Sequence, residues 1–131
     1  MMPQNIGQHR GACHCGAVTF EFKAPAKVSV TDCNCSICSL TAYQHVFVPA
    51  DDFTLLSGAE DLTAYRFGTG AAEHLFCRHC GVKAFYRPRS HPESYSVNFR
   101  AVTSGTLSIA EIIPFDGQDW EGNIKALKEK T

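Results

Sequence analysis

The chain contains 131 residues, of which 44% are hydrophobic and 19% are charged, and its formal net charge at pH 7 is -1. This length and composition predict a single globular domain over residues 1–131, and the mixed charges offer no basic surface for nucleic acid. No apolar run approaches the length of a membrane-spanning helix, and the first six residues lack the basic and apolar parts of a secretory signal. We therefore expect a cytoplasmic protein.

The first half of the chain is rich in short segments that alternate like half-buried strands. In residues 17–22, the side chains of Val18, Phe20 and Phe22 share one face. Residues 43–48, which precede a proline, have the β-branched and aromatic composition that strands favour. We predict strands at residues 17–22, 28–31, 43–48 and 53–56.

The second half continues this pattern up to a different C-terminal segment. Strands are predicted at residues 62–67, 73–76, 82–86 and 95–100, and residues 107–113 fit either a strand or a helical turn. Trp120, Ile124 and Leu127 have helical spacing, which predicts a short helix within residues 119–130, although Gly122 disfavours its start. The sequence therefore predicts a mainly β fold of short strands with a short C-terminal helix.

Closely spaced cysteines are the most informative feature of the sequence. Because their number is odd, they cannot all be paired in internal disulfides. In a reducing compartment, clustered thiolates are more often metal ligands or catalysts than disulfide partners. Metal binding is therefore the favoured interpretation of the seven residues Cys13, Cys15, Cys33, Cys35, Cys38, Cys77 and Cys80.

Four of these cysteines form two chelating pairs that are distant in sequence. Structural zinc usually has four tetrahedral ligands, often two pairs of cysteines, and Gly81 after the second pair allows a tight turn around an ion. We predict that one structural zinc joins the first strand to the middle of the chain through Cys13, Cys15, Cys77 and Cys80. The alternative is that the four thiols only fill the core.

The remaining three cysteines, Cys33, Cys35 and Cys38, predict a second zinc with one coordination position free for water or substrate. Three thiolates make the ion soft, which favours a sulfur ligand, and a thiol bound there would lose its proton. Other interpretations stay open. His45 or His14 could complete a structural site, the cysteines could form transient disulfides, or they could bind an iron–sulfur centre.

A combined pattern extends over these cysteine groups: G-A-C-H-C-G-A-V-T-F at residues 11–20, C-N-C-S-I-C at 33–38 and F-C-R-H-C-G at 76–81. Two later segments, V-N-F-R at 97–100 and F-D-G-Q-D-W-E at 115–121, belong to the same pattern. Together they resemble the glutathione-dependent formaldehyde-activating enzyme and centromere protein V family. The resemblance covers roughly residues 10–122.

The resemblance implies a zinc-containing β-tent fold of short, mostly antiparallel strands. It also implies that the four-cysteine zinc is structural and that the three-cysteine zinc lies at the active centre, where Cys33, Cys35 and Cys38 would be catalytic. The named enzyme of the family joins formaldehyde and glutathione to S-(hydroxymethyl)glutathione, and it is classed as a carbon–sulfur lyase in the reverse direction. The expected cofactor is two zinc ions per chain, and the expected partners are a thiol such as glutathione and an aldehyde.

Several other side chains are candidates for substrate contacts. Tyr43, Gln44 and His45 follow the cysteine cluster and are candidates for the pocket wall, whereas Trp120 is expected to anchor the C-terminal segment in the core. Candidates for general acid or base are His14, His45 and His79. Guanidinium groups match carboxylates, so candidate contacts to a substrate carboxylate are Arg66, Arg78, Arg87, Arg89 and Arg100. Arg100 is preferred because it lies in a family-like segment.

The leading hypothesis from the sequence is a cytoplasmic zinc-dependent carbon–sulfur lyase. In this hypothesis the three-cysteine zinc binds a thiol, whose sulfur attacks the aldehyde carbon. The alternative is a non-catalytic module in which both zinc ions are structural and the surface binds a protein partner.

Overall fold

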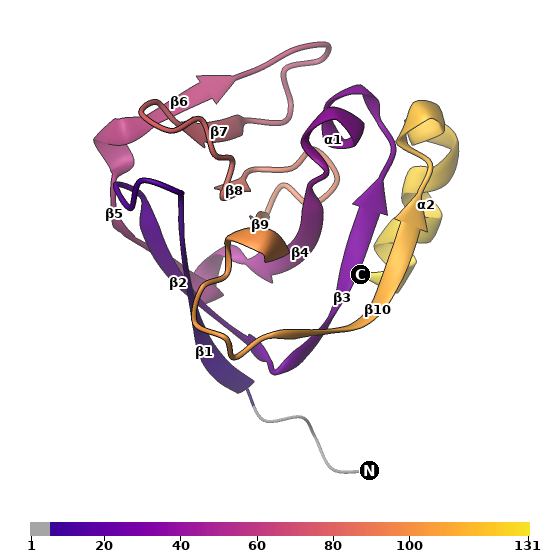
Figure 1. The fold of residues 1–131 in the computed structure, drawn as a ribbon. Coiled ribbons are helices and arrows are strands. Elements are labelled where there is room, and N and C mark those ends of the chain that lie inside the picture. The colour runs from indigo at the N-terminus through magenta and orange to yellow at the C-terminus, as the bar shows by residue number, and fades with distance from the viewer. Residues whose placement is uncertain (1–5) are drawn as a thin grey trace.

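The computed structural model describes residues 6–131, with the backbone alone for residue 130. Its described strands form three sheets (Figure 1). The first has the order β1-β2-β5 and consists of β1 (Ile6–Ala12), β2 (Thr19–Pro25) and β5 (Phe53–Ser57). The second has the order β10-β3-β4-β9-β8 and consists of β10 (Ser108–Phe115), β3 (Lys27–Cys33), β4 (Gln44–Pro49), β9 (Ser94–Asn98) and β8 (Phe85–Tyr86). The third pairs β6 (Leu62–Tyr65) with β7 (His74–Cys77).

Helices are few and short. Helix α1 (Ser36–Thr41) follows β3, and α2 (Trp120–Lys130) is the last element, lying beside β10 and β3 in Figure 1. Among the described residues, 3-10 turns cover Ala50–Asp52, Ala59–Asp61, Phe99–Ala101 and Gly117–Asp119. Within the described part of the chain, no helix has the length and apolar character needed to cross a membrane. The fold is therefore mainly β with a short C-terminal helix, as predicted.

One strand pairing places the end of the chain beside the cysteine cluster. The strand pairs are antiparallel except for β3 and β10, which run parallel with Phe115 opposite Cys33. The backbone N–H of Asn34 donates a hydrogen bond to the carbonyl of Phe115 over 3.2 Å. Because both strands end at this edge, the segment after Phe115 begins next to the first cysteine of the cluster.

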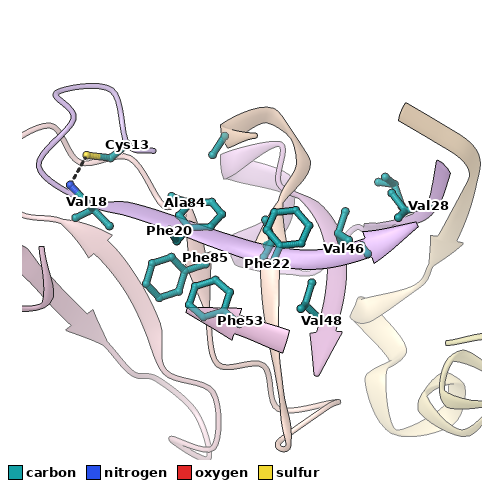
Figure 2. Packing of buried hydrophobic residues seen from close by; sticks show 14 of the residues in the cluster. Cys13, Val18, Phe20, Phe22, Val28, Val46, Val48, Phe53, Ala84 and Phe85 are labelled. Atoms are coloured by element: carbon teal, nitrogen blue, oxygen red, sulfur yellow. Dashed lines mark hydrogen bonds between the residues drawn. The ribbon is translucent and has the colours of Figure 1, made fainter. Parts of the chain in front are cut away.

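The main hydrophobic core is built around the aromatic face of β2. Phe20 is fully buried, and its ring centroid lies 5.5 Å from those of both Phe53 and Phe85. Figure 2 shows these rings meeting from different strands, with Phe22 further along β2 and Val46 of β4 beyond it. The alternation predicted for residues 17–22 is thus the alternation that fills the core.

A second, smaller cluster lies under the C-terminal helix. It contains two thiols of the three-cysteine group together with side chains of β10 and α2, namely Cys33, Cys38, Ile113, Phe115 and Leu127. Trp120 and Ile124 pack against this cluster, so the helical spacing seen in the sequence reflects packing on the cysteine region. Cys13 and Cys77, by contrast, belong to the main core.

Some elements differ from the sequence prediction. Most of the ambiguous segment 107–113 belongs to β10, which begins at Ser108, and the strand predicted at 82–86 is reduced to β8. The strand predicted at 95–100 ends at Asn98, where the side chain accepts a hydrogen bond from the N–H of Arg100 and begins a 3-10 turn. Helix α1 was not predicted, because its N-cap is a cysteine rather than one of the usual capping residues.

Strand β1 was also not predicted, because two unusual residues hide its alternation. His9 is buried, and its ring nitrogens contact the carbonyl of Ala24 at 3.0 Å and Thr106 Oγ1 at 2.6 Å, which satisfies a polar side chain inside the core. Gly11 faces Phe20 so closely that a β-carbon there would lie 2.3 Å from its ring. Residues 1–5, which entered the expectation about a secretory signal, lie outside the described residues.

Candidate functional site

The four cysteines of the two distant pairs come together in the structure. Cys13 lies directly after β1, Cys77 ends β7, and Cys15 and Cys80 lie in the turns that follow. Their Sγ atoms all lie within 4.8 Å of one another. Cys15 Sγ is 3.7 Å from Cys13 Sγ and 3.6 Å from Cys77 Sγ. The turns thus bring the first and third sheets together at one point.

The sulfur separations can be compared with those of a zinc–thiolate centre. Zinc binds thiolate at about 2.3 Å, so two thiolates of a tetrahedral site lie about 3.8 Å apart. The two measured separations agree with this value. Gly81, at a φ of 76°, donates its N–H to the carbonyl of Cys77 over 2.8 Å and closes the turn around the group. This group could therefore hold a zinc ion.

The other three cysteines lie where β3 passes into α1. Cys33 is the last residue of β3, Cys35 is the N-cap of α1, and Cys38 lies inside the helix. The N–H of Cys38 points to Cys35 Sγ at 3.5 Å, so the sulfur serves as the helix cap. The three Sγ atoms lie within 4.8 Å of one another and form a second group that could hold a metal ion.

Hydrogen bonding among these thiols makes them unequal. Hydrogen bonds from Cys33 and Cys38 hold the pKa of Cys35 far below its ordinary value, with a further contribution from backbone N–H groups. The hydrogen bond to Cys35 raises the pKa of Cys33 to about 11, and hydrogen bonds to Cys33 and Cys35 raise the pKa of Cys38 well above its ordinary value. Cys35 is thus the thiol that ionises first, at the N-terminus of the helix.

His45 contacts this group from behind. Its Nε2 lies 3.3 Å from Cys38 Sγ, and its Nδ1 lies 2.9 Å from Ser96 Oγ. Burial lowers the pKa of His45 to about 3, so the imidazole is neutral. The three Sγ atoms of the cysteines lie within 4.8 Å of one another, but the ring nitrogens of His45 do not belong to this group of atoms. As a fourth ligand, His45 would therefore have to move closer to the three sulfur atoms.

A cavity of about 490 Å³ opens beside the three cysteines. Aromatic and apolar side chains form much of its wall, including Phe47, Phe67, Tyr86, Phe115, Trp120 and Leu127. Its polar side chains include His45, His74, Arg89 and Gln118. The cysteines therefore face a mostly apolar space with a few polar groups, which is typical of small-molecule sites.

Among the described residues of this wall, Arg89 carries a charged side chain. Its guanidinium lies 3.7 Å from the centre of the Trp120 ring and donates a hydrogen bond to the exposed carboxylate of Glu121. Stacking and pairing together hold the guanidinium in place while leaving N–H donors free for another acceptor. Trp120 is therefore both a packing residue of α2 and part of the cavity wall.

Gly117 brings the segment after β10 against the cysteines. A β-carbon at this position would lie 2.6 Å from Cys33 Sγ and 2.8 Å from Cys35 Cβ. Neither neighbour is the flexible end of a long side chain, because one is the Sγ of a short, buried cysteine and the other is the Cβ of the helix N-cap. Glycine is thus required here by close approach to the three-cysteine group.

Replacing Gly117 by alanine is expected to displace either this segment or Cys33, and so to weaken metal binding at the three-cysteine group about tenfold or more, as loss of supporting contacts around metal ligands does. The four-cysteine group should keep its ion. Competition with a chromophoric chelator would measure both affinities. Gly7→Ala is the matched control, because a β-carbon at Gly7 meets nothing closer than 3.9 Å. Equal affinities in Gly117→Ala and the wild type would contradict this prediction.

Comparison with known proteins agrees with this geometry. A family model described as "Glutathione-dependent formaldehyde-activating enzyme" matches residues 8–118, which include all seven cysteines. The chain belongs to this family. The match also includes β10 and Gly117, so it extends to the segment that covers the three-cysteine group.

Two similar proteins show how far the similarity extends. A Halomonas elongata protein named "Putative glutathione-dependent formaldehyde-activating enzyme" is 35% identical in an alignment of 78 residues that covers 53% of this chain and 50% of that protein. The match thus spans about half the length of this curated relative. The crystal structure of a Rhodobacter sphaeroides protein superposes with a TM-score of 0.65 at 33% identity, covering 77% of this chain and 99% of that one.

The structure distributes the other candidate residues between the site and the surface. His45 lines the cavity, but Tyr43 is buried behind it and donates its hydroxyl to the carbonyl of Ser96 over 2.7 Å. His14 is exposed beside Cys15, and His79 is held at 2.8 Å from the carboxylate of Asp61 near the four-cysteine group. Neither is part of the cavity wall as the described residues define it.

Arg100, the preferred carboxylate contact, lies exposed on the 3-10 turn after β9 and is not in the described cavity wall, whereas Arg89 is. Sequence reasoning gave no role to His74, Phe67 or Gly117. Of these three residues, only Gly117 could have been singled out from the sequence, because it lies in the family-like segment 115–121. His74 and Phe67 reach the cavity through the pairing of β6 with β7 and the loop between them, which no local pattern predicts.

Proposed function

We propose that this family member is a zinc-dependent carbon–sulfur lyase of the S-(hydroxymethyl)glutathione synthase type, with a thiol such as glutathione and formaldehyde or a related aldehyde as its substrates. The observation that carries the proposal is the three-cysteine group itself, which offers three ligands to a metal ion and borders a cavity large enough for a small organic substrate. Family membership supports the choice of thiol and aldehyde.

In this proposal the roles of the two cysteine groups differ. Cys13, Cys15, Cys77 and Cys80 would hold a structural zinc, and Cys33, Cys35 and Cys38 would hold a catalytic one. When bound to the three cysteines, zinc would provide an open position that keeps a substrate thiol as its thiolate at neutral pH. The sulfur then attacks the aldehyde carbon, a C–S bond forms, and the π electrons of the carbonyl move to oxygen, which takes up a proton.

The side chains around the cysteines would orient the two substrates. The apolar side chains of the wall would reduce the number of water molecules around the carbonyl and so limit competition from hydration. Arg89 supplies free N–H donors for a carboxylate of the thiol substrate, and its position in the wall makes it a better candidate for this contact than the exposed Arg100.

A non-catalytic module with two structural zinc ions is the second candidate function, because His45 Nε2 already lies 3.3 Å from Cys38 Sγ. This arrangement would leave no open position for a thiol. The two functions therefore differ in one measurable property, the response of the second metal to a thiol.

The test uses protein purified without added zinc. We expect about two zinc ions per chain by elemental analysis, and we expect glutathione, but not S-methylglutathione, to change the X-ray absorption spectrum of the bound zinc. Exchange spectroscopy with carbon-13-labelled formaldehyde should then show that the protein accelerates the interconversion of formaldehyde and S-(hydroxymethyl)glutathione. Two zinc ions with a histidine ligand and no response to glutathione would instead support the structural module.

A further inference from the structure

His74 is a buried histidine in the wall of the cavity that the cysteines share. It begins β7, and its side chain is almost fully enclosed, with 5% of the residue exposed. The ring stacks with two aromatic rings: its centroid lies 4.8 Å from that of Tyr86 at an interplanar angle of 15°, and 5.3 Å from that of Phe67 at 22°. These stacked contacts fix the plane of the imidazole relative to the cavity.

Lys83 determines which nitrogen of His74 carries the proton. Lys83 Nζ lies 2.7 Å from His74 Nδ1. An ammonium group has donors only, so Nδ1 must be the acceptor of this hydrogen bond and the N–H must be on Nε2. The ammonium is itself held 3.8 Å above the centre of the Tyr86 ring and 4.9 Å from that of Tyr43.

The protonation states agree with this geometry. Burial and the charge of Lys83 lower the pKa of His74 to about 4, so the imidazole is neutral at pH 7. Burial lowers the pKa of Lys83 to about 8, opposed by the negative charge of the cysteine group, so the amine is still mostly protonated at pH 7. A charged donor therefore faces a neutral acceptor.

The remaining nitrogen of His74 is available to a ligand. Among the described residues, Nε2 has no hydrogen-bond partner. None of their side-chain nitrogen or oxygen atoms is both enclosed and unpartnered, so Nε2 is accessible. Lys83 occupies the Nδ1 edge and the two aromatic rings lie along the faces, so the open edge of the ring is the one that lines the cavity.

We propose that His74 is a further catalytic residue, whose Nε2–H donates a hydrogen bond to the carbonyl oxygen of the aldehyde, and that Lys83 is the positioning residue that holds this tautomer. The inference rests on the proposed function. As the sulfur attacks, the carbonyl oxygen gains negative charge and its hydrogen bond from Nε2–H strengthens. Water returns to this oxygen the proton that the thiol released on binding, so His74 stays neutral throughout.

The expected size of the effect follows from comparable sites. Removal of one donor to a developing oxyanion typically costs about 100- to 1000-fold in rate. His74→Phe keeps a ring beside Tyr86 and Phe67 but removes the donor, whereas His74→Gln keeps an N–H donor near the position of Nε2. Lys83→Met keeps an unbranched chain over Tyr86 but removes the charge.

The experiment compares these variants with the wild-type, zinc-loaded chain in three measurements: zinc content, the glutathione response of the metal, and the rate of formaldehyde–glutathione exchange. We expect His74→Phe to keep the wild-type zinc content and glutathione response but to lose about 100-fold or more in exchange rate. His74→Gln should retain at least a tenth of the wild-type exchange rate. Lys23→Met, at an exposed position of β2, is the control for Lys83→Met and should match the wild type.

Nitrogen-15 NMR of the histidine rings gives a readout that does not depend on activity. In the wild type, His74 should be a single Nε2–H tautomer, and Lys83→Met should convert it to a mixture. A single Nδ1–H tautomer in the wild type, or a wild-type rate in His74→Phe, would overturn the role of His74 alone. A wild type that binds two zinc ions but accelerates no thiol–aldehyde exchange would overturn the proposed function and this role together.

Discussion

Replacing Cys15 by serine is expected to release one zinc ion per chain and to lower the free energy of unfolding by about 3 kcal/mol or more, although this cysteine is exposed. Binding free energies of structural zinc in small peptides are about 10–16 kcal/mol, and this energy contributes to folding when the site exists only in the folded state. The four-cysteine group joins the turn after β1 to the end of β7, so loss of the ion would release two sheets from each other. Elemental analysis and thermal unfolding would measure both effects.

The exposure of Cys15 distinguishes a metal ligand from a core residue. If the four thiols only filled the core, Cys77→Ser would destabilise the protein, because Cys77 is 1% exposed, and Cys15→Ser would be nearly neutral. If they bind zinc, both variants lose the ion and a similar amount of stability. His14→Ala is the matched control, since His14 is exposed between Cys13 and Cys15 and should keep the ion. A stable Cys15→Ser variant with a full zinc content would contradict the structural zinc site.

Replacing Cys35 by serine is expected to remove the second zinc ion and to reduce thiol–aldehyde exchange about 100-fold or more, with little change in stability. Serine is one of the best helix N-caps, so its oxygen can replace the sulfur that now accepts the N–H of Cys38. The variant thus retains the helix start and loses one of three thiolate ligands. Zinc content, the thermal midpoint and the exchange rate would be measured on the same preparation.

Two controls make the result for Cys35→Ser specific. Ser39→Ala changes an exposed residue of the same helix outside the ligand group and should match the wild type. Cys35→Ala removes the cap together with the ligand and should be less stable than Cys35→Ser by about 1 kcal/mol. Undiminished exchange in a folded Cys35→Ser variant would exclude the three-cysteine mechanism.

Cys15→Ser and Cys35→Ser should also differ in which property they change, stability or exchange rate. Cys15 and Cys77 belong to a group whose loss should destabilise the whole chain, because two sheets meet there. Cys35 belongs to a group seated at one helix start, beside a smaller hydrophobic cluster that does not depend on a link between sheets. One zinc ion would thus support the fold and the other would support the chemistry.

The sequence by itself determined the division of the cysteines and the main character of the fold. Spacing within each pair is local, and a tetrahedral ion accepts four thiolates, so the division of seven into four and three followed from arithmetic and coordination chemistry. Alternation in residues 17–22 predicted the strand that fills the core, because the period of a strand is also local. The helix at the C-terminus followed in the same way from Trp120, Ile124 and Leu127.

Only the tertiary structure decided what surrounds the three cysteines. The parallel pairing of β10 with β3 brings Gly117 and Trp120 to the cluster, and the pairing of β6 with β7 brings His74 to the same cavity. These contacts join residues far apart in the chain, so no local period records them. Arg100 was preferred over Arg89 because it lies in a family-like segment, and only the folded chain distinguishes the exposed Arg100 from Arg89 in the cavity wall.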